Sequence, residues 1–166
     1  MTVRIAPLED AAPDAVEALL DAAFGADRAQ RTAYRIRDGM AAVTDLSFAA
    51  FSTEMLVGTI QTWPISVGTA PALLVGPVAV DPNHQRAGIG RMLMDALLRA
   101  APDAPMAMIG DPEYYGRFFG FSADATSQWV VPGPVERHRL LARNAETLPV
   151  RGTVGPRAFA DARATP

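Results

Sequence analysis

Two periods govern the alternation of hydrophobic and polar positions along the chain, and each predicts one kind of element. In residues 13–24 and 91–101 the apolar side chains recur every three or four positions, which is typical of a helix with one buried face. The other apolar segments are shorter and favour extended backbone, so they predict strands. These predicted strands cover residues 2–6, 46–51, 55–65, 72–80, 106–109, 128–131 and 137–142, with Phe121 as a further strand piece.

Turn-forming residues separate these segments and leave room for two shorter helices. One helix is predicted over residues 27–37, and the other begins at Pro112, because proline suits the first turn of a helix. Residues 52–54 suit the turn of a hairpin. From about residue 144 onward the pattern fades, which predicts a loop whose last seven residues fray.

The order of the predicted elements, β-α-α-β-β-β-α-β-α-β-β, indicates a mixed α/β or α+β fold. A length of 166 residues favours one domain, which we assign to residues 1–159, with residues 160–166 as a tail. Pro77 lies inside the predicted strand at residues 72–80. Because proline cannot donate to a ladder, this strand should bulge or splay near Gly76-Pro77.

The segment Gln85-Arg86-Ala87-Gly88-Ile89-Gly90 joins that strand to the helix at residues 91–101. A helix start leaves backbone N–H groups without internal partners, and the helix dipole adds about half a positive charge there. Glycine has no Cβ, so at Gly88 and Gly90 the chain can turn sharply and a bulky anion can approach the backbone. The strand, turn and helix together predict a site for a phosphate or pyrophosphate.

Other readings of this glycine loop fit less well. A dinucleotide-binding fingerprint would have a third glycine where Leu93 stands, and would lie near the first strand of the chain. A P-loop would require lysine before serine or threonine, and the chain has no lysine. A tight turn without a ligand is the remaining alternative for a glycine pair considered alone.

Composition excludes several classes of function. A net charge of −3 gives no electrostatic argument for nucleic acid or for an anionic membrane as a partner. The absence of cysteine excludes disulfides, a thiolate nucleophile and zinc–thiolate sites, and two histidines far apart in the chain do not predict a metal site. Since there is neither a signal-peptide pattern nor an apolar run of about 18 residues, we expect a cytoplasmic protein.

Further segments complete a pattern around the glycine loop. Residues 76–82 precede it, and the aromatic run at residues 114–121 follows it. Together they resemble the GNAT superfamily of N-acetyltransferases. The chain is also similar to a branch of small bacterial predicted N-acetyltransferases, through a Gly-Asp-Pro-x-Tyr-Tyr segment at residues 110–115 and a late segment with Gly152-Thr153-Val154 and Phe159. The resemblance spans residues 2–159, and implies a mostly antiparallel twisted sheet with flanking helices and a V-shaped opening between two splayed central strands.

The resemblance implies acetyl-CoA as a co-substrate, with no metal. In the family, main-chain amides of the glycine loop hold the CoA pyrophosphate. Here those amides would come from Gln85, Arg86, Ala87, Gly88, Ile89, Gly90 and Arg91. Along the preceding strand, Val78, Ala79 and Val80 would pair with the pantetheine arm, and the N–H of Val78 would polarise the thioester carbonyl.

Tyr115, and after it Tyr114, are the candidate general acids, because a phenol can protonate the departing CoA thiolate. The family has a tyrosine five residues before the phenylalanine of its Gly-Phe end. In this chain that spacing falls on Gly116, so a bulge or longer turn must absorb one extra residue. No general base stands out among the conceivable residues, which are Glu54, Asp81, His84 and Asp111. Asp81 is expected to shape a turn and Asp111 to cap the helix that Pro112 opens.

The implied reaction moves an acetyl group to an amine by direct attack in a ternary complex, since no cysteine is available for an acetyl-enzyme. A non-catalytic acyl-CoA-binding or sensing module, and an enzyme with another acyl-CoA donor, stay open as alternatives. The acceptor would be a small-molecule or peptide amine, with Phe24, Met55 and Trp63 as conceivable pocket residues. The basic run at residues 137–139 is interpreted as solvated charge rather than as a binding site for an acidic acceptor. A homodimer is possible, because dimers are common among similar proteins.

Overall fold

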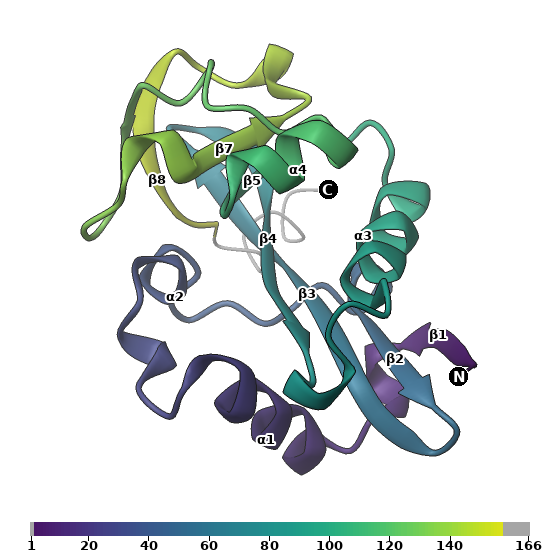
Figure 1. Ribbon diagram of the computed structural model, residues 1–166. Helices are drawn as coiled ribbons and strands as arrows, with labels where there is room; N and C mark the ends of the chain where they lie inside the picture. Colours follow the sequence, from purple (N-terminus) through teal and green to yellow (C-terminus); the bar gives the residue numbers. More distant parts are fainter. Residues whose placement is uncertain (1, 158–166) are drawn as a thin grey trace, which may run out of the picture. The chain divides into compact units, whose positions relative to one another are not determined.

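The computed structural model describes residues 2–157, so the expected tail at residues 160–166 and Phe159 of the late motif lie outside the described residues. Contacts between residues divide the described chain into two compact units. Unit 1 consists of residues 2–28, 42–62 and 76–102, and unit 2 consists of residues 29–41, 63–75 and 103–157. Strands β3 (Met55–Val67) and β4 (Ala70–Val80) contribute residues to both units (Figure 1).

Antiparallel strands form the frame of unit 1. β1 (Val3–Pro7) pairs with β2 (Phe48–Ser52), and β2 pairs with β3 across the two-residue turn Thr53-Glu54. The predicted hairpin is therefore confirmed. A shift in register between Ala50 and Phe51 marks a bulge, which increases the local twist of the pair.

Helix α1 (Pro13–Phe24) covers one face of these strands. It begins with Pro13 in its first turn and ends at Gly25, as the sequence predicts. Its buried residues pack into a cluster with small side chains of the strands, Ala49 of β2 and Ala79 of β4 among them. Small strand residues let the helix approach closely, which fixes the position of the end of β4 in unit 1.

Helix α3 (Ile89–Ala100) covers the opposite face of the strands of unit 1. Ala50 points away from the cluster under α1, because successive side chains of a strand alternate between faces. Its partner Gly58 therefore also faces away from α1, and a Cβ built on Gly58 would lie 2.7 Å from the Cγ2 atom of Ile89. The start of α3 thus rests directly on the backbone of β3.

Unit 2 contains strands that come together from distant parts of the chain. β5 (Met106–Ile109) lies between β4, to which it is parallel, and β7 (Leu140–Arg143), to which it is antiparallel. The pairing of β4 with β5 consists of Leu73 opposite Met106 and Leu74 opposite Ala107. This ladder stops before Gly76-Pro77, in agreement with the splay predicted there.

A second group of strands in unit 2 includes the last strand of the described chain. β8 (Arg151–Pro156) runs antiparallel to the end of β3 and parallel to β6 (Gln128–Val130). Trp129 of β6 is fully buried, and its Nε1–H donates to the carbonyl oxygen of Pro149 at 2.9 Å. β8 corrects the expectation of a loop beyond residue 144.

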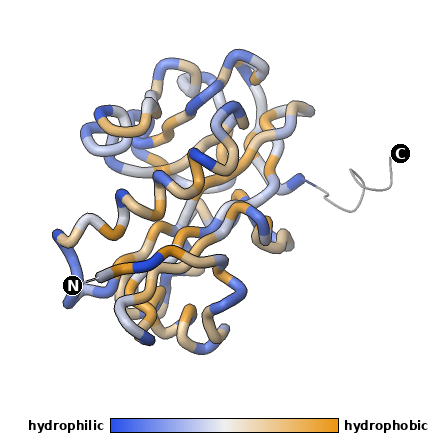
Figure 2. The backbone as a smooth tube through the Cα atoms, turned by 90° about the vertical axis from the view of Figure 1, so that its right-hand side faces the viewer, coloured by the Kyte–Doolittle hydropathy of each residue, from blue (hydrophilic) through white to orange (hydrophobic). Residues whose placement is uncertain are grey.

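Unit 2 also contains α2 (Thr32–Ile36) and α4 (Pro112–Phe119). The expectation of one helix over residues 27–37 is wrong, because Arg31 has extended backbone and separates a short 3-10 helix from α2. Figure 2 shows how hydrophobic and hydrophilic stretches alternate along the backbone. The 3-10 helices are η1 (Leu8–Asp10), η2 (Arg28–Gln30), η3 (Thr44–Leu46), η4 (Pro82–His84), η5 (Arg137–Arg139) and η6 (Ala145–Thr147).

The expectation of a strand from residue 137 is also corrected, since β7 begins only at Leu140. Residues 137–139 form η5 instead, because the guanidinium of Arg137 turns back to donate to the carbonyl oxygens of Ser127 and Trp129. The mixed, mostly antiparallel sheet with flanking helices is confirmed, since only β4–β5 and β6–β8 are parallel pairs among the described strands. Within residues 2–157, no helix is long and apolar enough to cross a membrane.

Candidate functional site

The glycine loop leaves β4 through a turn that Asp81 shapes, as predicted. The N–H of Asp81 donates to the carbonyl oxygen of Val57 at 2.8 Å, so the turn is tied to β3. The carboxylate of Asp81 accepts from the N–H of Asn83 at 2.8 Å and stabilises η4. His84 closes this turn half-buried, with its Nδ1 atom 3.8 Å from the Asp81 carboxylate.

The start of α3 carries backbone N–H groups that make no bond within the helix. Gly88 precedes the helix with a left-handed backbone (φ 77°, ψ 14°), and Arg86 before it also has a positive φ of 72°. Gly88 carries no capping side chain, and its carbonyl accepts the first helical bond from the N–H of Met92 at 3.0 Å. The N–H groups of Ile89, Gly90 and Arg91 therefore precede the first helical bond, where a helix attracts an anion.

The side chains of α3 hold this start in place. Ile89, Leu93, Met94 and Leu97 are completely buried or nearly so, whereas Arg86, Ala87 and Gly88 are exposed. The first turn thus has a buried anchor directly beside an accessible backbone. Such an arrangement holds donors rigidly while leaving room for a large anion.

The strand that leads into the loop shows two kinds of environment. Ala79 is fully buried in the cluster under α1, while Val78 and Val80 are half-buried. These three residues belong to unit 1 together with the whole segment from Gln85 to Arg91. Unit 1 therefore contains every residue that the sequence assigns to the CoA site.

Helix α4 in unit 2 carries the two candidate acids. Its start follows the prediction: the carboxylate of Asp111 accepts from the N–H of Glu113 at 3.0 Å, and Pro112 occupies the first turn. Its end is widened, because the N–H of Gly120 bonds to the carbonyl oxygen of Tyr115 as well as to that of Gly116. A wider turn of this kind can accommodate the extra residue of the aromatic run.

Tyr115 lies in an aromatic cluster beside a glycine. Its ring is 4.9 Å from that of Tyr114 and 6.4 Å from that of Phe121, measured between centroids. A Cβ on Gly110 would lie 2.8 Å from the Tyr115 ring, so only glycine lets the ring pack against this backbone. Burial, with smaller effects of Tyr114 and Asp111, raises the pKa of Tyr115 to about 12, and Arg139 opposes this shift.

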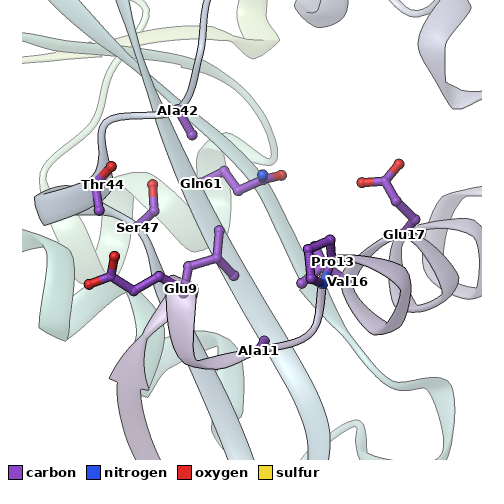
Figure 3. A pocket seen from close by; sticks show the side chains of 10 residues that line it. Glu9, Ala11, Pro13, Val16, Glu17, Ala42, Thr44, Ser47 and Gln61 are labelled. Carbon is purple, nitrogen blue, oxygen red and sulfur yellow. The ribbon is translucent and has the colours of Figure 1, made fainter.

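Two larger pockets with charged side chains in their walls lie one in each unit. In unit 1 a pocket of about 400 Å³, here called the Glu9 pocket, lies between the start of α1, residues 42–47 and Gln61 of β3 (Figure 3). Its lining is mostly apolar and includes Glu9 and Glu17. Arg28 holds Glu17 in an ion pair at 2.6 Å, whereas no salt bridge within residues 2–157 engages Glu9, the other carboxylate of this pocket.

The second pocket lies in unit 2 and has a volume of about 620 Å³. We call it the Arg139 pocket. Its lining comes from the segment around α2, from the last residue of β5 and from the segment before β7: Gln30, Arg31, Thr32, Ala33, Ile109, Pro134, Val135, Glu136 and Arg139. Sequence reasoning assigned residues 137–139 to solvated charge, and only the fold reveals that Arg139 is half-buried in a pocket wall.

Neither of these cavities is lined by the residues that the sequence suggested for the acceptor pocket, Phe24, Met55 and Trp63. Trp63 is buried, and the Arg37 guanidinium stacks over its ring at 3.6 Å. Phe24 packs against the cluster under α1, and Met55 is exposed at the hairpin. Among residues 2–157, no group of three or more acidic or histidine side chains is arranged to hold a metal ion.

Comparison with known families identifies the chain. The family model of the acetyltransferase (GNAT) family matches residues 13–110, which is more than half of the sequence. The chain belongs to the GNAT acetyltransferase family. The match includes β4, the glycine loop and α3, but ends before the tyrosines of α4. Among curated proteins, none matches the chain.

Solved structures of other GNAT proteins share the fold. A GNAT family N-acetyltransferase from Escherichia coli (YhbS) in complex with CoA is 22% identical with a TM-score of 0.68, covering 96% of this chain and 91% of that one. A GNAT family acetyltransferase from Brucella melitensis in complex with acetyl-CoA is 26% identical with a TM-score of 0.65, covering 96% and 99%. The GNAT fold predicted from the sequence is thereby confirmed.

Proposed function

We propose that this GNAT protein is an acetyl-CoA-dependent N-acetyltransferase that transfers the acetyl group to an amine in a ternary complex. The observation that carries the proposal is the start of α3, whose first N–H groups precede any helical bond and follow an exposed, left-handed Gly88. The similar Brucella protein was crystallised with acetyl-CoA, which supports this choice of substrate.

The fit between the glycine loop and CoA follows from charge and size. A pyrophosphate needs several donors that converge without intervening side chains, and Gly88 has no atom within 4 Å of where a Cβ would stand. In the proposed complex the amides from Arg86 to Arg91, with that of Gln85, hold the pyrophosphate. The backbone of Val78, Ala79 and Val80 pairs with the pantetheine arm, and the Val78 N–H polarises the thioester carbonyl.

The proposed step is nucleophilic attack by a neutral amine on the thioester carbon. The new C–N bond forms, the carbonyl oxygen carries negative charge in the tetrahedral intermediate, and the C–S bond then breaks. The proton lost by nitrogen ends on the CoA sulfur. Positioning of the two substrates and polarisation of the carbonyl supply much of the acceleration.

Tyr115 is the proposed group that assists the leaving sulfur. With a pKa of about 12 its hydroxyl stays protonated throughout the neutral range. Full proton transfer to an alkyl thiolate, whose pKa is about 8.5, would be uphill by about 5 kcal/mol. We therefore assign Tyr115 a hydrogen bond to the departing sulfur, with the proton of the amine passing through the phenol as the C–S bond breaks.

Calorimetric titration with acetyl-CoA, with CoA and NAD as controls, tests the site. We expect micromolar binding of both CoA species and none of NAD. A folded protein that binds neither CoA species would refute the proposal and leave residues 85–90 as a structural turn.

Replacement of Tyr115 by Phe separates an enzyme from an acyl-CoA-binding module. In an enzyme, Y115F lowers kcat by about 10²- to 10⁴-fold and leaves the affinity for acetyl-CoA unchanged. Replacement of Tyr114 by Phe is the matched comparison, because Tyr114 shares the helix and the aromatic cluster and is the second candidate acid; a loss of kcat in Y114F alone would move the role to Tyr114. A wild-type protein that binds acetyl-CoA but acetylates no amine in a broad screen would favour the binding module.

A further inference from the structure

The Arg139 pocket adjoins the candidate acid through one glycine. The N–H of Gly110 donates to the carbonyl oxygen of Arg139 at 3.0 Å, and the ring of Tyr115 packs against the same Gly110. Ile109, the residue before Gly110, lines the pocket. Arg139 is also close enough to Tyr115 to act on it electrostatically. The pocket therefore begins beside Tyr115, all within unit 2.

The walls of the pocket are held rigidly. The hydroxyl of Thr32 donates to the carbonyl oxygen of Pro134 at 2.6 Å. The guanidinium of Arg35 donates to the carbonyl oxygen of Pro132 at 3.3 Å. A Cβ on Gly133 would lie 2.6 Å from the Thr32 hydroxyl oxygen, so glycine is required for this close approach. The segment before β7 is thus clamped on α2, and the pocket does not have to be ordered by its ligand.

The charge of the pocket is positive. Arg31 and Arg139 line it with one carboxylate, Glu136, which lies 3.8 Å from the exposed His138 ring. No salt bridge joins the half-buried Arg139 to a carboxylate within residues 2–157. A guanidinium in a pocket wall suits a carboxylate or phosphate, which it can bind with two parallel hydrogen bonds.

We propose that the Arg139 pocket binds the acceptor, and that the acceptor is an amine that also carries a carboxylate or phosphate, held by Arg139. This inference rests on the proposed function, because it takes Tyr115 as the group beside the leaving sulfur. The volume of about 620 Å³ fits a small metabolite. Arg139 then selects the acceptor, and Arg31 adds to the positive field at the pocket.

Pairs of acceptors that differ in one anionic group test whether the enzyme prefers an anionic amine. β-Alanine is compared with β-alaninamide, phosphoethanolamine with ethanolamine, and putrescine serves as a cationic amine. We expect kcat/KM to favour the carboxylate or the phosphate member of a pair over its neutral partner by about 10- to 100-fold, the range of a charge-assisted contact. The pair with the larger ratio tells whether a carboxylate or a phosphate is preferred. Equal rates within both pairs would overturn the proposal. A preference for putrescine would also overturn it, and would favour the Glu9 pocket.

Variants of Arg139 test whether its guanidinium binds the anionic group of the acceptor. R139Q should raise KM for the anionic acceptor by about 10- to 100-fold and leave the neutral acceptor unchanged, whereas R139K should recover part of the loss because it restores the charge without the planar fork. R99Q, at an exposed position of α3, is the matched control. An equal loss for anionic and neutral acceptors would mean that Arg139 only supports the fold.

Binding alone distinguishes failure of this inference from failure of the proposed function. If no amine is acetylated, titration with β-alanine and with inorganic phosphate still reports on the pocket. Binding that disappears in R139Q but not in R99Q supports the pocket, and absence of anion binding to a folded protein overturns it. A folded wild-type protein that does not bind acetyl-CoA would instead refute the proposed function.

Discussion

Replacement of Gly58 by Ala tests how the start of α3 is positioned. The new Cβ would stand 2.7 Å from Ile89 Cγ2, 3.1 Å from Leu93 Cδ1 and 3.2 Å from the carbonyl oxygen of Ala79. Ordinary carbon contacts lie at about 3.5–4.0 Å, so Ile89 would have to recede by about 1 Å. Overpacking of this kind costs about 1–3 kcal/mol of the free energy of unfolding.

The predicted loss of stability in G58A is opposite to the usual effect of replacing glycine by alanine in a strand. In an open position of a strand, alanine in place of glycine stabilises by up to about 1 kcal/mol. Gly155 of β8 is such a position, since nothing lies within 4 Å of its Cβ direction, and G155A is the matched control. We expect G58A to lower Tm by about 2–12 °C in a chain of this length, and G155A to leave it unchanged or raised.

Urea unfolding of a double-mutant cycle isolates the contact. I89A alone removes a buried side chain and costs about 2–5 kcal/mol. Combined with G58A it also removes the clash, so the double variant should be at least about 1 kcal/mol more stable than the two single effects predict. Additive effects, or a G58A protein as stable as the wild type, would refute the reasoning. Because α3 begins at Ile89, the single variant G58A should also bind acetyl-CoA more weakly.

Three further predictions concern other parts of the chain. Replacement of Gly88 by Ala should cost about 1–2 kcal/mol through the backbone alone, since φ is 77° and nothing lies within 4 Å, and G88N should cost less because asparagine tolerates this region. The raised pKa of Tyr115 favours the neutral phenol in the folded state, so its contribution of up to about 3 kcal/mol is complete below pH 10 and disappears as the pH rises through about 12. Replacement of Trp129 by Phe should cost about 1–3 kcal/mol, because it leaves the Pro149 carbonyl without its donor.

Chemical unfolding measures all three, and each has an informative control. Equal losses in G88A and G88N would show that the left-handed backbone is not the cause. The alkaline loss of stability should be missing in Y115F, and its persistence there would assign it to another group. If W129F is as stable as the wild type, the indole contributes no net hydrogen bond.

Local signals account for the elements that the sequence predicted well. Pro13 and Gly25 mark the ends of α1, and the pair Asp111-Pro112 starts α4, because each acts on the backbone within one turn of its own position. The turn at the glycine loop was equally recognisable, since Gly88 permits the left-handed backbone that precedes α3. Pro77 correctly indicated where the ladder with β5 would stop.

Long-range contacts account for what the sequence did not reveal. β8 contains two glycines and a proline, and it is a strand only because β3 and β6 pair with it from far along the chain. The basic run at residues 137–139 follows a strand-like pattern, yet hydrogen bonds from Arg137 to distant carbonyls make it a 3-10 helix. The position of Arg139 in a pocket depends on Gly110, which no sequence periodicity connects to it.

The segments of the two units alternate along the chain, so the units become complete at different times during synthesis. Unit 1 has all its residues once position 102 has left the ribosome, whereas the edges of β3 and β6 wait for residues 151–156. An open strand edge is a template for pairing with other chains. A premature stop between residues 102 and 151 would therefore yield a polypeptide with a complete unit 1 and unpaired strand edges in unit 2. Chaperones and proteases would act on such a polypeptide, because unpaired edges promote aggregation.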